Sequence, residues 1–485
     1  MGYVRSVYGA RGGIGSQLDS TSIQNKITQT LTYLFVFMYS SDWTSFFRDI
    51  QALASTPGSS SKDHVPGILL YLRTLLSVHD EIADVMVSKS SEDQNRHRDL
   101  KDMVRQRDAA DISSSWQEIL AEWKMRDSSV TELCLRTIGR WVSWTDISLV
   151  VNDSVINVLF ELLSTSDAVQ DTSVTKKRDA AIETFTEIMG KKMNASDKLE
   201  LVEVLKTRQV VSQLVDGPAL RDLRSTSQYD IDLAENVAKL VNNTVYDIVK
   251  ALDGAQDGDS VTQRGISQLH SFMPFILRFF SDEYDEVCVT VIPCLTDLLT
   301  LLRNKMKMNS RQYSDSLREL PPPILDAIIA KMRYDETSTW GNEDAQTDEA
   351  EFQDLRKKLY NLQRAVAAVD ENLCLEKFSN VISLTFDNYQ TQNGQLDWRD
   401  LDLALHEMYL FGELALKEGG LYSKTGPTSS AAERLIAMML KMIESGSLHV
   451  YLIVLVLTFI RYRFLHSSSY PITIYGNLCA LFRFF

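Results

Sequence analysis

The chain has 485 residues, of which 44% are hydrophobic and 24% are charged, and its formal net charge is −15. This length exceeds one ordinary hydrophobic core and predicts several cores or one elongated array, while the composition excludes a largely disordered chain. The acidic balance disfavours long-range attraction of nucleic acid, although a local basic patch overrides the global sign.

The five cysteines include no CxxC pair, which indicates a reducing compartment and argues against a structural zinc site. The first residues lack the apolar stretch of a secretory signal, so the cytosol or the nucleus is the expected location. Residues 1–20 are rich in glycine and are expected to form a flexible N-terminal segment.

Nearly every later segment has the periodicity of an amphipathic helix. The first helices are predicted at residues 23–40, 42–54, 65–88 and 97–125, the last of them as one long helix. The stretch LCLRTIGRWVSWTDISLVVN (133–152) then predicts two helices joined by a tight turn. Ser129 and Glu132 have the spacing of a capping box at the start of the first. Arg140 and Asp146 either pair across the turn or face a ligand.

Pairs of amphipathic helices recur through the rest of the chain. They are predicted at 176–190 with 196–207, 228–251 with 260–280, 284–303 with 322–333, 349–367 with 371–388, and 398–417 with 431–444. A recurrence of about 40 to 50 residues is typical of a HEAT or armadillo-like α-solenoid, in which stacked pairs share one continuous core. We therefore predict an all-α solenoid over residues 21–445, with an all-α protein of another shape as the alternative.

Residue patterns that carry catalysis are scarce. The sequence has no HExxH motif and no Walker-type phosphate loop, and its seven histidines are scattered without metal-ligand spacing. The pair Asp348 and Glu349 lies in an acidic, solvated stretch where nothing would raise the pKa of one carboxyl group for acid catalysis. We expect no enzyme activity, no metal and no cofactor.

Five segments in order resemble the exportin-T branch of the importin-β family, in its fungal form. They are NKITQTLTYLFVFMYSSDWTSFFRDI (25–50), LCLRTIGRWVSWTDISLVVN (133–152), KKRDAAIETFTEIMGKKM (176–193), MRYDE (332–336) and WRDLDLALHEMYLFGE (398–413). The first alone is similar to the wider exportin branch, whereas five in the right order are specific. Because the family has further repeats before and after the matched region, the chain is expected to be incomplete at both ends.

The resemblance implies a receptor that works by binding. It would bind mature tRNA together with Ran in its GTP form, interact with nuclear pore proteins, and shuttle between nucleus and cytoplasm. The RNA would be held mainly through its phosphates and the shape of its A-form arms. The alternative is a HEAT-repeat scaffold, or an exportin for protein cargo, that binds no RNA.

Two basic clusters are the candidate RNA contacts: Lys176, Lys177 and Arg178, predicted at a helix start, and Lys191 and Lys192 at its end. Lysines at a helix end favour the helix dipole, so the second cluster also has a structural explanation. Cations at a helix start interact unfavourably with the dipole, so the first cluster lacks this structural explanation. It is therefore the better RNA candidate.

An acidic run at 335–352 has seven carboxylates and no base, and is predicted as a loop between helices. It is either a solvated loop or a contact for the basic face of the GTPase. The candidate residues are Asp335, Glu336, Glu343, Asp344, Asp348, Glu349 and Glu351.

Aromatic residues at helical spacing are usually core, so we expect structural roles for Trp43, Phe46, Phe47, Trp141 and Trp144. Residues 446–485 form an atypical apolar tail that is expected to lie outside the family fold. Its apolar run at 450–460 is shorter than the roughly 20 residues of a membrane span and is closed by two arginines. We expect no stable membrane insertion, with a tail anchor as the alternative.

Overall fold

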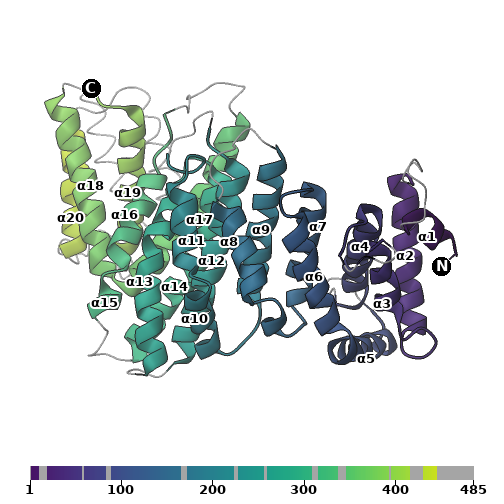
Figure 1. The fold of residues 1–485 in the computed structure, drawn as a ribbon. Coiled ribbons are helices and arrows are strands. Elements are labelled where there is room, and N and C mark those ends of the chain that lie inside the picture. Colours follow the sequence, from purple (N-terminus) through teal and green to yellow (C-terminus); the bar gives the residue numbers. More distant parts are fainter. Residues whose placement is uncertain are drawn as a thin grey trace. The chain divides into compact units, whose positions relative to one another are not determined.

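The computed structural model describes residues 2–9, 19–56, 59, 61–83, 89–164, 172–222, 228–255, 259–308, 315–336, 346–392, 395–415 and 430–444. Every regular element in these ranges is helical (Figure 1). The chain divides into two compact units, residues 1–301 and residues 302–485, each of which is described separately below.

The first unit contains the elements α1 (Gly2–Tyr8), α2 (Thr21–Met38), α3 (Phe46–Gln51), η1 (Ala52–Ala54), α4 (Val65–Ile82), α5 (Ser91–Arg107), α6 (Ala109–Trp123), α7 (Ser128–Val142), η2 (Ile147–Leu149), α8 (Asp153–Ser164), α9 (Thr172–Gly190), α10 (Ala195–Val204), α11 (Thr207–Asp216), α12 (Ile231–Gly254), α13 (Ser260–Phe280) and most of α14 (Asp285–Met308).

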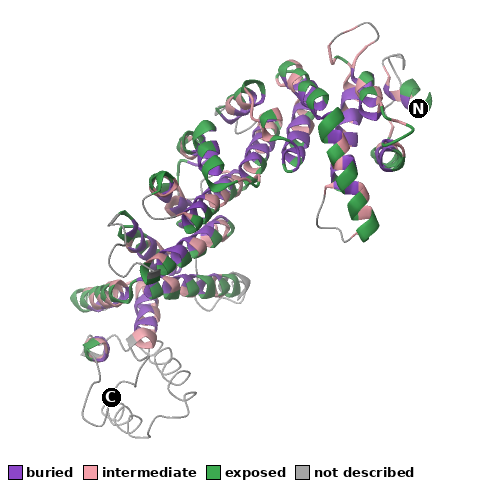
Figure 2. Ribbon diagram, turned by 90° about the horizontal axis from the view of Figure 1, so that it is seen from below, coloured by how far each residue is buried: buried purple, intermediate pink, exposed green. Residues whose placement is uncertain are grey.

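Helices of the first unit form two rows. In one row α2, α4, α7, α9 and α12 pack in succession, and in the other α6, α8, α11 and α13 do so. The rows contact each other through α6 with α7, α8 with α9, and α12 with α13. Figure 2 shows the buried residues on the helix sides that face the other row. This stacking of helix pairs around a shared core is the predicted α-solenoid arrangement.

The second unit contains the end of α14 and α15 (Asp315–Arg318), α16 (Pro321–Lys331), α17 (Gln346–Val369), α18 (Glu371–Thr391), α19 (Trp398–Ala415) and α20 (Ser430–Glu444). Each of α16 to α19 packs against the next in sequence, and α20 contacts both α18 and α19. Helices that follow one another in the sequence of this unit are therefore also neighbours in space.

The single long helix predicted at 97–125 is wrong. The chain forms α5 and α6, which are separated at Asp108, a buried residue. The carboxylate of Asp108 accepts a hydrogen bond from the Tyr39 hydroxyl group, and Arg107 donates to the Tyr39 carbonyl oxygen. This long-range anchoring ends α5 without the glycine or proline that would have marked a break in the sequence.

Two local details also differ from prediction. Helix α7 is capped by Asp127, whose carboxylate accepts from the backbone N–H groups of Ser129 and Val130, and not by a capping box of Ser129 and Glu132. Helix α11 was not predicted; it begins directly after Lys206, whose φ of 46° ends the preceding helical run.

Part of the predicted flexible N-terminal segment is helical. In α1, Val4 and Tyr8 are buried, and the Tyr8 hydroxyl group donates to Asp19 at 3.0 Å. The predicted apolar tail, residues 446–485, lies outside the described residues. Within the described part of the chain, no helix has both the length and the apolar character that crossing a membrane requires.

Candidate interaction surfaces

The two tryptophans of the 133–152 stretch belong to an aromatic cluster between rows. Trp141 at the end of α7 is 0% exposed, and its ring lies edge-on to Trp116 at 5.8 Å and to Phe47 at 6.1 Å. Its Nε1–H donates to the Leu75 carbonyl oxygen at 2.9 Å. The ring of Trp144 contacts that of Trp141 at a tilt of 41°, with ring centres 4.6 Å apart. The cluster therefore joins α3, α4, α6 and α7.

Polar contacts hold the turn that follows Trp141. The Nε1–H of Trp144 donates to Nδ1 of His79 at 3.0 Å. Asp146 caps η2 by accepting hydrogen bonds from the backbone N–H and the hydroxyl group of Ser148. These two hydrogen bonds lower the pKa of the Asp146 carboxyl group. Arg140 instead lines a groove together with residues of α4, α9 and α12, so the alternative in which it pairs with Asp146 is not the arrangement seen.

The other aromatic candidates lie near the start of the described solenoid. Phe46 and Phe47 are buried in α3. Trp43 precedes them, is half-buried, and donates from Nε1 to the Asp49 carboxylate at 2.7 Å. All five predicted structural aromatics thus take part in packing or in a local hydrogen bond.

The first basic cluster does not lie at a helix start. Helix α9 begins at Thr172, so Lys176, Lys177 and Arg178 occupy its second turn and their expected conflict with the dipole is smaller. Only Lys176 of the three is exposed. Lys177 donates to the Lys124 carbonyl oxygen at 3.2 Å, beyond the end of α6.

Arg178 is a structural residue in this chain. It is 8% exposed, and its guanidinium group binds the carboxylate of Asp230 at 2.6 Å. Asp230 also caps α12 by accepting from the Leu233 backbone N–H. Arg178 therefore ties α9 to the start of α12, and this pairing leaves it a poor candidate for a phosphate contact.

The second basic cluster lies where α9 ends. Lys191 donates to the carbonyl oxygens of Val142 at 2.7 Å and Thr145 at 2.6 Å, at the end of α7. Burial lowers the pKa of this lysine. Lys192 is exposed. Lys191 is thus a helix-end cation whose hydrogen-bond partners are neutral carbonyl groups.

Cations recur at helix C-termini in both units. Lys198 donates to the carbonyl oxygens of Met189 and Lys191 after α9, and Arg105 donates to that of Trp144 after α7. Arg356 does the same for Met332 after α16. Each donates to carbonyl groups that have no partner inside their own helix, and its positive charge interacts favourably with the negative end of the helix dipole. Among the described residues, this accounts for two of the buried cations, Lys198 and Arg356.

A groove of about 560 Å³ lies over the row formed by α4, α7, α9 and α12. Its charged lining residues are three cations and three carboxylates: Arg136, Arg140, Lys239, Asp80, Glu183 and Glu187. Arg136 pairs with Glu132 at 3.0 Å and with Glu183 at 3.5 Å. The balance of charges in this groove gives no reason for it to attract a polyanion.

The acidic candidates divide between described and undescribed residues. Asp335, Glu336 and Glu351 are exposed. Glu343 and Asp344 lie outside the described residues, and of Asp348 and Glu349 only the helical backbone is described. Helix α17 begins at Gln346, three residues before the helix start predicted at 349, so the last part of the acidic run is helical and is not a loop.

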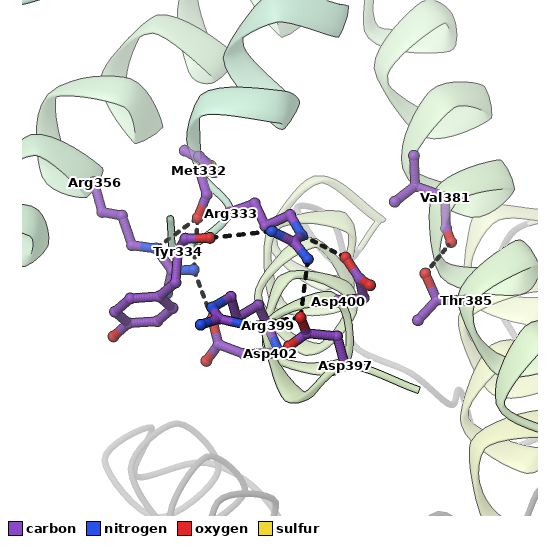
Figure 3. A network of polar contacts seen from close by, with 10 residues as sticks. All are labelled: Met332, Arg333, Tyr334, Arg356, Val381, Thr385, Asp397, Arg399, Asp400 and Asp402. Atoms are coloured by element: carbon purple, nitrogen blue, oxygen red, sulfur yellow. Dashed lines mark hydrogen bonds and ion pairs between the residues drawn. The ribbon is translucent and has the colours of Figure 1, made fainter. Parts of the chain in front are cut away.

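The motifs MRYDE and WRDLD come together in an ion-pair network of the second unit (Figure 3). Arg333 binds Asp400 at 2.5 Å and Asp397 at 3.4 Å. Arg399 binds Asp397 at 2.8 Å and donates to the Glu336 carbonyl oxygen at 2.7 Å. The network therefore joins the segment after α16 to the start of α19.

Arg356 extends this network into the core. It is buried, pairs with Asp402 at 2.6 Å, and donates to the Met332 carbonyl oxygen. Its guanidinium group also lies over the rings of Tyr334, at 4.6 Å, and Phe352, at 4.9 Å. The sequence predicted a GTPase contact for Asp335 and Glu336 of MRYDE, but no role for the arginines and aspartates that form this network. The signal for the network was the number of arginines and aspartates in two short segments. The network binds three segments of the same unit.

A buried carboxyl group lies farther along α19. Glu407 is 0% exposed and accepts from Nε2 of Gln363 at 2.9 and 3.1 Å. Burial raises the pKa of this carboxyl group to about 8. The group is therefore mainly protonated at neutral pH.

We expect Glu407→Gln to remove a pH dependence of stability. The pKa of Glu407 is raised in the folded protein from its ordinary 4.5 to about 8, so folding stabilises the protonated group. Its contribution to the free energy of unfolding is complete below about pH 4.5 and is lost as the pH rises to about 8. Urea unfolding at pH 6 and pH 8.5 should show the variant gaining stability relative to the unchanged chain at the higher pH. If the free energies of unfolding of the variant and the unchanged chain differ by the same amount at both pH values, Glu407 is not a buried neutral carboxyl group.

Comparison with known proteins gives two family matches. The Exportin 1-like protein model matches residues 20–185, and the Exportin-T model matches residues 259–462. Exportin-T of Aspergillus clavatus is 51% identical over 450 residues, which are 92% of this chain and 43% of that protein. Exportin-T of Podospora anserina is 52% identical over 89% of this chain, and that of Chaetomium globosum 53% identical over 92%.

A solved structure, importin-13 in a cytosolic state, matches the fold with a TM-score of 0.61 at 11% identity. The match covers 90% of this chain and 55% of that one. Together with the stacked helix pairs, it defines the class as a protein with an α-solenoid fold. Within this class the chain belongs to the exportin-T family. It spans about 43% of the length of the curated relative from A. clavatus. The predictions of fold class and family are confirmed.

Proposed function

We propose that the chain acts in nuclear export of tRNA, binding mature tRNA together with Ran in its GTP form for passage through the nuclear pore. The observation that carries the proposal is the identity of 51% with exportin-T over 92% of the chain. The protein would work by binding and would shuttle between nucleus and cytoplasm. The stacked helix pairs of the first unit supply a surface of successive helices, which suits a large ligand.

Among the basic candidates, Lys176 and Lys192 suit a phosphate contact best because their side chains are exposed. Lys191 adds positive charge beside Lys192, since its partners are neutral carbonyl groups. For the GTPase, Asp335, Glu336 and Glu351 remain the described acidic candidates. Attraction between these carboxylates and the basic face of the GTPase would mainly raise the rate of association at low salt.

A mobility-shift experiment tests the proposal. Labelled mature tRNA is titrated with the chain alone, with Ran loaded with a GTP analogue, and with both. We expect the largest shift with both proteins, because cooperative ligands raise each other's affinity by the same factor.

In the control, Ran loaded with GDP replaces Ran loaded with the GTP analogue. The chain and this form of Ran together should leave the tRNA unshifted at the same concentrations. If the chain binds the GTPase but never retards tRNA, it is a protein-binding scaffold, and the RNA part of the proposal is wrong. If it retards tRNA equally with and without the GTPase, the coupled export cycle is wrong.

A further inference from the structure

Helix α5 is unusually polar for a helix of a solenoid. Of its 17 residues only His97, Leu100 and Val104 are buried. It follows α4 and precedes α6, and it contacts both. A helix with so narrow an apolar stripe contributes little to the core, so most of its side chains are available to solvent or to a partner.

Three cations of α5 lie on one flank. Arg98, Lys101 and Arg105 have the spacing i, i+3 and i+7, which places them on the same side of a helix over about 10 Å. Glu92 and Asp99 point roughly 100° or more away round the helix. We call Arg98, Lys101 and Arg105 the basic flank of α5.

The charges of the basic flank are only partly neutralised. Arg98 donates to the neutral amide oxygen of Asn95 at 2.7 Å, and Lys101 has no ion-pair partner among the described residues. Only Arg105 has a carboxylate, that of Asp102 at 2.5 Å. Burial, followed by the nearby charge of Arg105, lowers the pKa of Lys101, as expected where cations are close together.

The basic flank continues onto the end of α9. Arg105 donates to the Trp144 carbonyl oxygen, and Lys191 donates to that of the next residue, Thr145. The two cations thus meet on the turn after α7, and the exposed Lys192 follows Lys191 in the sequence. Asp146 is the acidic residue of this turn, and it is engaged in capping η2.

We propose that the basic flank of α5, with Lys191 and Lys192, binds phosphates of the RNA backbone. The inference rests on the proposed tRNA binding and adds to it a contact helix, α5, with Arg98 and Lys101 as its main contacts. A chain of net charge −15 repels a polyanion at long range, so RNA binding requires a local excess of cations such as this one. The groove over α4 to α12, with equal numbers of both signs, has no such excess.

The test is tRNA binding by the variant Arg98→Ala/Lys101→Ala, measured with the GTPase present over a range of salt. Loss of two phosphate contacts should weaken binding at low salt. It should also make the slope of log affinity against log salt shallower by up to about 1.4–1.8. Between about 50 and 200 mM salt, the unchanged chain should then lose about tenfold more affinity than the variant.

The control Arg126→Ala/Lys239→Ala removes the same charge at two exposed sites where the cation is paired with a glutamate. It should bind tRNA as the unchanged chain does. The swap Arg98→Lys/Lys101→Arg keeps both charges and should retain the salt slope. Circular dichroism of all variants should match that of the unchanged chain.

Equal affinity and slope in the α5 variant and the control would overturn this inference while leaving tRNA binding intact. A lower affinity with an unchanged slope would also overturn it, because the residues would then act through folding. If the variant loses GTPase binding and keeps RNA binding, the surface is a protein contact. If the unchanged chain binds no tRNA at all, the proposed function itself has failed.

Discussion

Replacing Trp141 by alanine is expected to lower the free energy of unfolding by about 3–5 kcal/mol. The side chain is 0% exposed and touches aromatic rings from α3 and α6 as well as Trp144. Its removal leaves a cavity between helices that are fixed by other contacts and cannot close in. The substitution also removes the hydrogen bond from Nε1 to the Leu75 carbonyl oxygen.

Urea unfolding followed by circular dichroism measures this effect. Met125→Ala is the control, because Met125 is 76% exposed and its truncation should change stability by no more than about 0.5 kcal/mol. If the midpoint for Trp141→Ala moves as little as that of the control, the aromatic cluster does not stabilise the first unit, and a binding role for Trp141 has to be reconsidered.

The sequence predicted most helices because their apolar residues recur at helical spacing, and this signal is local. It failed where a distant residue decides the outcome. The break at Asp108 depends on Tyr39, 69 residues earlier in the chain. Helix α11 was missed because its boundary is set by one left-handed residue, Lys206, in a run without glycine or proline.

Candidate contacts were predicted less well than helices, for the same reason. Arg178 looked available until the structure paired it with Asp230, 52 residues away, and Lys191 was already engaged by the end of α7. The buried tryptophans were predicted because aromatic side chains at helical spacing are nearly always core. The sequence does not indicate the basic flank of α5, because the pattern at 97–125 predicts one helix and the polar character of its first part is averaged into the whole.

Replacing Arg356 by methionine is expected to destabilise the second unit by about 3–5 kcal/mol. Arg356 and Asp402 are both largely buried, so the variant leaves the Asp402 carboxylate in the interior without its cation. The carbonyl oxygen of Met332 loses its donor, and the rings of Tyr334 and Phe352 lose the guanidinium group that covers them. The large effect arises from what is left unpaired as much as from the contacts removed.

The neighbouring residue supplies the control. Lys357 is paired with Asp354 at the surface, where its side chain is 76% exposed, and Lys357→Met should cost at most about 1 kcal/mol. The double variant Arg356→Met/Asp402→Leu removes both charges and should recover much of the lost stability. If Arg356→Met unfolds at the same urea concentration as Lys357→Met, the ion pair contributes nothing. If the double variant is no more stable than Arg356→Met, the loss comes from packing on Tyr334 and Phe352, because an unpaired Asp402 is then not its cause.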